Sequence, residues 1–184
     1  MIVIKLGGSL GQSEILVNCL HKLKRNYKTR SVVIVPGGGA FADQVRIAQQ
    51  QFKFDDSTAH RMAILAMQQM AFLINGLNNT LPIAHSITMV PSLIQQHKAV
   101  IWSPDIIELD NAGIRPSWDI TSDSLSAWVA GTLSAKELIL VKATTINKNY
   151  TLQQLAKVDI IDQSFCDYVS HVNYKVTIVN ADNL

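Results

Sequence analysis

MIVIKLGGS (residues 1–9) and SVVIVPGGG (residues 31–39) each combine an apolar, β-branched run with the cluster of glycines that ends it. Such short runs, stopped by glycine, are typical of buried parallel strands. Glycine lets the backbone adopt a positive φ and approach a ligand closely. If a helix follows each turn, the free N–H groups of its first turn and its dipole favour an anion. With Lys5 just ahead of the first turn, the two stretches predict a site for a ligand that carries more than one phosphate group.

Strands and helices alternate along the rest of the chain. This order predicts right-handed crossovers and an α/β three-layer sandwich, with helices on both faces of an open, mostly parallel sheet. We expect further strands at 86–90, 99–102, 137–141 and 175–179, and one short edge strand at 106–109 in an otherwise irregular loop. The helices are expected at 12–28 with Ser13 as N-cap, 40–51, 57–77, near 93–96, from about 121 to 133, 152–156 and 163–172. No linker or low-complexity tract divides the chain, which predicts a single domain over residues 1–184.

The composition limits the classes of partner. Of 184 residues, 48% are hydrophobic and 16% are charged, which is more apolar than an ordinary monomer and indicates a subunit interface in a homo-oligomer. The net charge of +2 is too small to indicate a nucleic-acid partner. The basic residues between Lys22 and Arg30 occupy one side of a helix whose other side is apolar, and a solvated face explains them.

The sequence lacks the patterns that are typical of exported, membrane-bound and metal-binding proteins. Cys19 and Cys166 have no metal or redox spacing, and no signal peptide or apolar run of membrane length precedes the first strand. We therefore expect a cytoplasmic protein with no membrane association and no resident metal site. His60 and His85 are isolated from other ligand types and are expected to be structural.

Polar residues stand at the carboxyl ends of the expected strands, where sheets of this type bind ligands. They are Lys5 with Gly7, Gly8 and Ser9; Gly37, Gly38 and Gly39; Thr121, Ser122 and Asp123 at a helix start; and Lys142. An ammonium group in an apolar strand is costly unless a ligand or carboxylate neutralises it. Asp123 is suited to hold such ammonium groups, although a carboxylate in a first helical turn also stabilises the helix by itself. Tight turns alone would equally explain the glycines, and neither turn matches the P-loop or dinucleotide pattern.

The residues resemble the amino acid kinase superfamily, which includes acetylglutamate, carbamate, uridylate and isopentenyl phosphate kinases. Four motifs in order carry the resemblance: K-L-G-G-S, V-P-G-G-G-A-F-A-D, W-D-I-T-S-D-S-L-S-A-W-V-A and E-L-I-L-V-K. The last two look most similar to the aminomethylfuran phosphate kinase-like branch, which is linked to methanofuran and tetrahydromethanopterin biosynthesis.

The resemblance implies an ATP- and Mg²⁺-dependent kinase that transfers the γ-phosphoryl group to a phosphate monoester or related small acid. It implies catalytic roles for Lys5, Asp123 and Lys142. The nucleotide would be bound by Gly7, Gly8, Ser9, Lys142, Ala143 and Thr144. The acceptor would be bound by Gly37, Gly38, Gly39, Phe41, Asp43, Thr121 and Ser122.

Two departures from the family pattern fall in the nucleotide half of the site. The family usually has a T-D-V-D-G-like run after its nucleotide strand, where this chain reads K-A-T-T-I-N (residues 142–147). Many members also carry a later catalytic lysine, and residues 162–168 contain none. Lys142 either takes over that charge or has a structural role. The departures leave open a non-catalytic member that binds a nucleotide or metabolite as a partner subunit or sensor.

Overall fold

The computed structural model describes residues 1–12 and 14–184, so the expected cap at Ser13 lies outside the described residues. Its core is a six-stranded sheet with the order β3-β4-β2-β1-β5-β6. All neighbouring strands in it are parallel. The strands are β1 (Ile2–Leu6), β2 (Val32–Pro36), β3 (Ile83–Ala84), β4 (Ala99–Trp102), β5 (Glu137–Lys142) and β6 (Lys175–Asn180).

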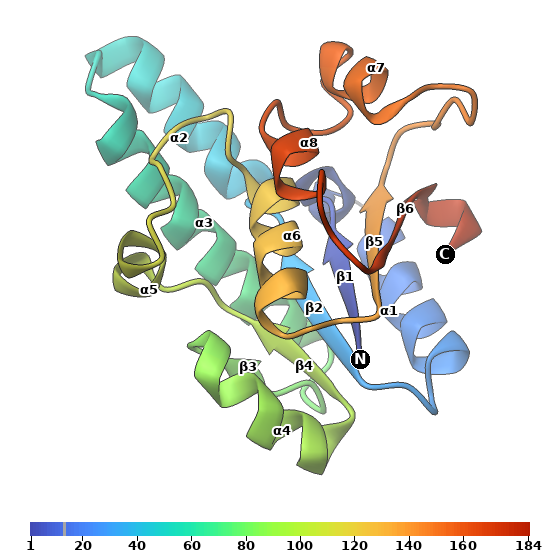
Figure 1. The fold of residues 1–184 in the computed structure, drawn as a ribbon. Coiled ribbons are helices and arrows are strands. Elements are labelled where there is room, and N and C mark those ends of the chain that lie inside the picture. The colour runs from blue at the N-terminus through green and yellow to red at the C-terminus, as the bar shows by residue number, and fades with distance from the viewer. Residues whose placement is uncertain (13) are drawn as a thin grey trace.

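Helices cover both faces of this sheet, as the alternating pattern predicted (Figure 1). They are α1 (Ile15–Asn26), α2 (Gly39–Phe52), α3 (Asp56–Leu77), α4 (Val90–His97), α5 (Ile106–Asn111), α6 (Ser122–Thr132), α7 (Leu152–Lys157) and α8 (Phe165–Tyr168). Successive side chains of a strand point to opposite faces. Ile2 and Ile4 of β1 accordingly pack in the cluster that contains α1, and Val3 packs in the cluster that contains α6. Lys5 lies on the same face as Val3, the face toward α6.

Three expected elements were wrong. The segment 86–90 is a 3₁₀ turn (Ile87–Met89) that leads into α4, because Pro91 occupies the first turn of that helix, where proline is well tolerated. Residues 106–109 belong to α5 and not to an edge strand, because the Asp105 side chain caps the helix by accepting from the Glu108 N–H at 2.9 Å. The helix expected at 163–172 is only the short α8, because the N–H and the hydroxyl of Ser170 both donate to the Asp167 carbonyl and close a turn there.

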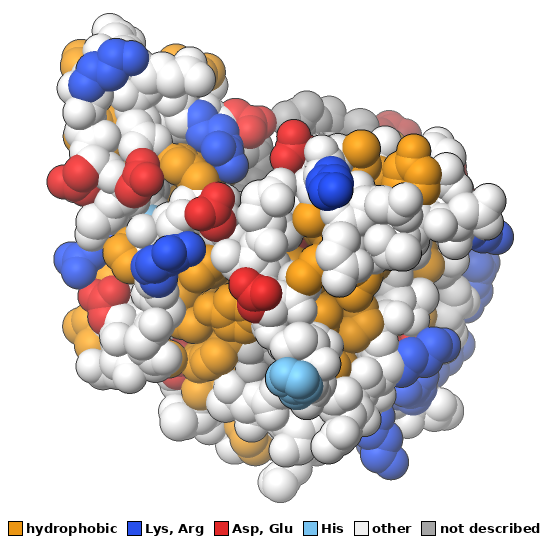
Figure 2. Space-filling view, turned by 45° about the horizontal axis from the view of Figure 1, so that its top comes forward, with side chains coloured by type: hydrophobic (Ala, Val, Ile, Leu, Met, Phe, Trp, Pro, Cys, Tyr) orange, Lys and Arg blue, Asp and Glu red, His pale blue; other side chains and the backbone are white. Residues whose placement is uncertain are grey.

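Among residues 1–12 and 14–184, no helix is long and apolar enough to cross a membrane. The basic side of α1 is not wholly solvated, because the Lys22 ammonium donates to the carbonyls of Ala181 and Asp182 near the end of the chain. The ends of α2 and α3 project from the body of the molecule, and a hollow lined by hydrophobic and charged side chains lies at the base of this projection (Figures 1 and 2).

The glycine turns after β1 and β2 pack backbone against backbone. A Cβ on Gly8 would lie 2.4 Å from the Gly39 nitrogen, and a Cβ on Gly37 would lie 2.4 Å from the Gly8 nitrogen. Gly39 adopts a φ of +56°, which side chains disfavour. Only glycine therefore permits the two strand ends to approach this closely.

Substitution Gly8→Ala is expected to lower the free energy of unfolding by about 1–3 kcal/mol, because the new methyl group meets rigid backbone. Gly76→Ala is the matched control: its Cβ would have no neighbour within 4 Å on α3, and alanine should raise the free energy of unfolding by about 0.5–1 kcal/mol. Urea unfolding followed by circular dichroism measures both. Equal stability of the Gly8 variant and the unmodified protein would contradict the close packing.

Candidate functional site

A cavity of about 980 Å³ opens at the carboxyl edge of the sheet. The ends of β1 and β5, the start of α6 and residues 159–163 surround it. The sequence-predicted residues that line it are Lys5, Gly7, Gly8, Ser9, Thr121, Asp123, Lys142, Ala143 and Thr144. The expected convergence of the strand ends is thus present in the structure.

A second, smaller cavity of about 230 Å³ adjoins the first at Gly8, Ser9 and Thr121. Its lining includes Gly38, Gly39, Asp43 and Ser122 from the predicted set. Gly37 is buried against Gly8 and supports the turn from behind. Phe41 lines neither cavity and is 38% exposed on α2.

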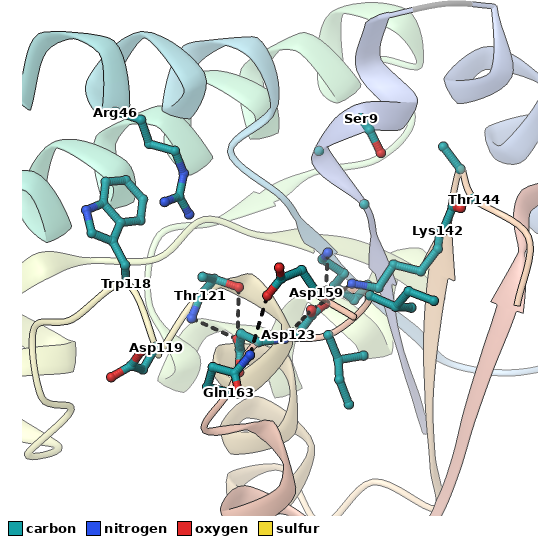
Figure 3. Close-up of a pocket in the computed structure, with 17 residues that line it drawn as sticks. Ser9, Arg46, Trp118, Asp119, Thr121, Asp123, Lys142, Thr144, Asp159 and Gln163 are labelled. Carbon is teal, nitrogen blue, oxygen red and sulfur yellow. Dashed lines mark hydrogen bonds and ion pairs between the residues drawn. The ribbon is translucent and has the colours of Figure 1, made fainter. Parts of the chain in front are cut away.

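Asp123 forms ion pairs with both lysines of the larger cavity (Figure 3). The Lys5 ammonium lies 2.9 Å from its Oδ1, and the Lys142 ammonium lies 2.7 Å from its Oδ2. Lys142 ends β5, which pairs with β1, and Asp123 stands in the first turn of α6 above both strands. The side chains of Lys5 and Asp123 are 5% and 4% exposed, so the three charged groups meet in a largely dry environment.

The charges of this triad are unequal, with two ammonium groups for one carboxylate. Burial raises the pKa of Asp123, but the charges of Lys5 and Lys142 and their hydrogen bonds outweigh it and keep that pKa below its usual value. Burial and the nearby Lys5 charge lower the pKa of Lys142 to about 8, although Asp123 acts in the opposite direction. The triad itself carries one more positive than negative charge, although Asp162, which also lines the cavity, acts on Lys142 in the same direction as Asp123. An anion beside the triad would stabilise both ammonium groups further.

Asp162 is a residue of the site that sequence reasoning missed. Its Oδ2 accepts from the Thr121 N–H and hydroxyl, each at 2.8 Å, and from the Ser124 N–H at 2.9 Å, and its Oδ1 accepts from the Ser124 hydroxyl. Thr121 holds the N-cap position of α6 without a cap bond of its own, so Asp162 caps the helix from a distant segment. Its backbone N–H also donates to Asp123 at 3.2 Å. No local pattern signals this contact, because the partners are 38 to 41 residues apart.

Arg46 and Trp118 lie together between the two cavities and line both (Figure 3). The Arg46 guanidinium stands 3.7 Å from the centroid of the indole ring. Asp43, to which the resemblance gives a role in acceptor binding, and Arg46 both belong to α2. The structure places both at the smaller cavity, with Arg46 stacked on Trp118.

The two histidines have structural contacts. His60 is buried and forms a hydrogen bond with the backbone of Ser117, and the ring of His85 lies 6.3 Å from that of Phe72. His60 also lines the smaller cavity, which the sequence did not indicate.

The two cavities together can hold two ligands whose anionic ends meet at Gly8 and Ser9. Lys5 and Lys142 contribute their positive charge to the larger cavity, and the N-terminus of α6 borders both cavities at Thr121. Such positioned cations and backbone N–H groups are what the transfer of a phosphoryl group requires, because the protein supplies little covalent chemistry to that reaction.

Comparison with known proteins places the chain in a family. The family described as "Amino acid kinase family" matches residues 1–145. The chain is 30% identical over 153 residues to the [5-(aminomethyl)furan-3-yl]methyl phosphate kinase of Methanocaldococcus jannaschii, a match that covers 82% of this chain and 68% of the relative.

Solved structures with a similar fold include two nucleotide kinases. Uridylate kinase from Archaeoglobus fulgidus has a TM-score of 0.75 at 17% identity, with 99% of this chain and 92% of that chain covered. UMP kinase from Ureaplasma parvum has a TM-score of 0.73 at 16% identity, with 98% of this chain and 89% of that chain covered. At these identities the likeness concerns the fold, and it confirms the predicted sandwich.

Substitution Asp162→Ala is expected to lower the free energy of unfolding by about 2–4 kcal/mol, because it leaves the start of α6 without its acceptor. The matched control is Asp167→Asn, since Asp167 is exposed on α8 in the same segment and its loss should change stability by less than about 0.5 kcal/mol. Thermal and urea unfolding measure both changes. If Asp162→Ala proved no more destabilising than the control, the distant cap would have no energetic role.

Proposed function

The chain belongs to the amino acid kinase family, and on that premise we propose that it transfers the γ-phosphoryl group of ATP to a phosphate monoester or related small acid. The observation that carries this proposal is the Lys5–Asp123–Lys142 triad in the larger cavity, which adjoins the smaller cavity. In this proposal the nucleotide occupies the larger cavity and the acceptor occupies the smaller one.

Each side of the junction has a separate task in the proposed reaction. Gly7, Gly8 and Ser9 bind the phosphates of ATP, while Ala143 and Thr144 continue the nucleotide site beyond β5. Lys5 and Lys142 stabilise the charge that develops on the γ-phosphoryl oxygens, and Asp123 holds the two ammonium groups in place. Gly38 and Gly39 lie between donor and acceptor, and Asp43, Thr121 and Ser122 complete the acceptor side. Gly37 supports the turn from behind, and Phe41 takes no part because it lines neither cavity.

The chemical step needs no additional base when the acceptor is an ionised phosphate. An acceptor oxygen attacks the γ-phosphorus while the bond from that phosphorus to the β,γ-bridging oxygen breaks. The products are ADP and a diphosphate ester, and the charge of the two substrates passes to the products without a separate proton donor. This agrees with a triad whose carboxylate is engaged by two lysines.

The relative from M. jannaschii supports a phosphate monoester as the acceptor, because its name gives [5-(aminomethyl)furan-3-yl]methyl phosphate as the group that is phosphorylated. We therefore propose a place in the biosynthesis of a one-carbon cofactor of the methanofuran or tetrahydromethanopterin type.

The position of Lys142 supports catalysis over the non-catalytic alternative. That alternative depended on the missing T-D-V-D-G-like run and the missing late lysine. Lys142 bears on the second departure alone, where residues 162–168 contribute Asp162 instead of an ammonium group. Lys142 reaches Asp123 from β5 and brings a second ammonium group next to Lys5. The nucleotide strand itself thus supplies the charge that the family usually takes from a later segment.

Mg²⁺ and a second subunit complete the proposal. The described residues contain no cluster of three or more acidic, histidine or cysteine side chains suited to a metal, so Mg²⁺ would be held chiefly by the phosphates of ATP, whose charge it neutralises.

A second copy of the chain would cover the exposed apolar side chains of α2 and α3, such as Phe52 and Phe72, and sedimentation analysis would test this assembly.

The kinase activity is tested by coupled ADP release with ATP, Mg²⁺ and small phosphate monoesters, including [5-(aminomethyl)furan-3-yl]methyl phosphate. Lys5→Ala is expected to lower kcat about 10²–10³-fold, because it removes a cation aimed at the transferred group. Lys175→Ala, which removes an exposed lysine from β6, is the matched control and should leave the rate unchanged. If Lys5→Ala kept full activity, the proposed role of Lys5 would be overturned, although the kinase activity itself would stand.

A second prediction concerns pH. Because the pKa of Lys142 is lowered to about 8, its ammonium group loses its proton as the pH rises through that value, and kcat/KM for ATP should fall with the lost charge. Lys142→Arg keeps the positive charge at all accessible pH values, so the residual activity of this variant should show no decline near pH 8. Initial rates between pH 6 and about 9.5 measure both profiles. An identical decline in the arginine variant would assign the titration to another group.

A further inference from the structure

Arg46 is the sole lysine or arginine among the described residues that line the smaller cavity. It extends from α2 and also borders the larger cavity. Its guanidinium is therefore placed where an anionic group of an acceptor and the γ-phosphate of a donor would come together. The triad lysines Lys5 and Lys142 line the larger cavity and not the smaller one.

The Arg46 side chain is oriented by a chain of contacts. Its guanidinium stacks on Trp118 at 3.7 Å, and the indole N–H of Trp118 donates to Oε1 of Gln49 at 2.7 Å. The amide nitrogen of Gln49 in turn donates to Asp56 at 2.8 Å, where α3 begins. Stacking occupies one face of the guanidinium and leaves its N–H groups, which lie in the plane of the group, available to a ligand.

A third element holds the loop that carries Trp118. His60 of α3 bonds to the backbone of Ser117, the residue before the tryptophan. Burial lowers the pKa of His60, although its bond to Ser117 and the charge of Asp110 act in the opposite direction. The imidazole is therefore mainly neutral at pH 7 and adds little positive charge to the cavity.

The remaining lining of the smaller cavity is mixed, with Asp43 and the hydroxyl residues Ser9, Thr121 and Ser122 beside an apolar wall. Ile64 and Met67 of α3, Ile120 before α6 and Leu125 within it supply this wall. The cavity volume of about 230 Å³ suits a small body, such as a short chain or a single ring. The cavity thus combines an apolar wall with one guanidinium, stacked on Trp118, and one carboxylate, Asp43, from the same helix.

We propose that Arg46, held against Trp118, binds the phosphate of the acceptor and makes the smaller cavity selective for small phosphate monoesters with an apolar body. This inference rests on the proposed function. A guanidinium presents two parallel N–H groups that match two phosphate oxygens. A phosphate dianion also carries about twice the charge of a carboxylate, so a carboxylic acid of the same shape gains less from Arg46. The same cation reduces the repulsion between the acceptor phosphate and the γ-phosphate.

The test uses benzyl phosphate and methyl phosphate as probes, with phenylacetate as the carboxylate of similar shape. The variants are Arg46→Gln, Arg46→Lys and Trp118→Leu. Arg25→Gln is the matched control, because it removes an exposed arginine from α1, outside both cavities. Circular dichroism checks that each variant is folded. Because Arg46 is exposed, its replacement should leave the core intact.

In the kinetic arm, Arg46→Gln should raise KM for benzyl phosphate about 10- to 100-fold and change KM for ATP by less than about twofold. Arg46→Lys should raise KM for benzyl phosphate less than Arg46→Gln does. Trp118→Leu should also raise this KM, because Arg46 loses the ring on which it stacks. Unchanged KM for benzyl phosphate in Arg46→Gln, beside a working wild-type enzyme, would overturn the assignment and leave the proposed function standing.

A binding arm separates the two proposals if no probe is turned over. Trp118 stacks on Arg46, whereas Trp102 is fully buried and packs against Trp128, so a phosphate at Arg46 should change the emission of Trp118 selectively. Titration with benzyl phosphate should give a saturable change in the wild type and in Arg25→Gln that is lost in Arg46→Gln. Phenylacetate should bind at least about tenfold more weakly. Absence of a phosphate-dependent change in the wild type, or equal binding of the two probes, would overturn the inference.

Discussion

The site depends on one carboxylate that is shared by two ammonium groups. Buried charges are costly unless they are paired, and Asp123 pairs with Lys5 and Lys142 within 3 Å. Each lysine repels the other, and the carboxylate between them permits both to remain in one buried place. Removing it would leave two like charges uncompensated. The arrangement therefore depends on Asp123, and in the proposed function the phosphates of the nucleotide add further negative charge at the open side.

The sheet makes this pairing possible. β1 and β5 are parallel neighbours, and their carboxyl ends bring Lys5 and Lys142 to the same edge. The first turn of α6 lies above that edge and places Asp123 between the two lysines. Asp162 fixes the position of α6 by capping it and by donating its N–H to Asp123. A positioning residue on a distant segment thus controls the geometry of a triad drawn from three other elements.

The two cavities meet where the glycine turns touch. Gly8 and Gly37 allow the ends of β1 and β2 to approach to a distance that any side chain would prevent. The two cavities consequently share a wall of backbone, and both are bordered by the stacked pair Arg46 and Trp118, as the proposed transfer between a donor and an acceptor requires. This shared boundary is what distinguishes a transfer site from two separate binding sites.

The sequence by itself determined the parallel sandwich, the glycine turns and the lysines, Lys5 and Lys142, that lie near the ends of two of the strands. Strong apolar periodicity, glycine and local capping chemistry act over a few residues, so they can be read along the chain. The short pieces at 86–90 and 106–109 were misassigned because single residues, Pro91 and Asp105, decided them against a weak apolar pattern. Only the tertiary structure decided that Asp162 caps α6, that Lys142 turns toward Asp123, and that Trp118 stacks on Arg46. Each of these contacts joins segments that are distant in sequence, and packing of the whole fold selects such partners.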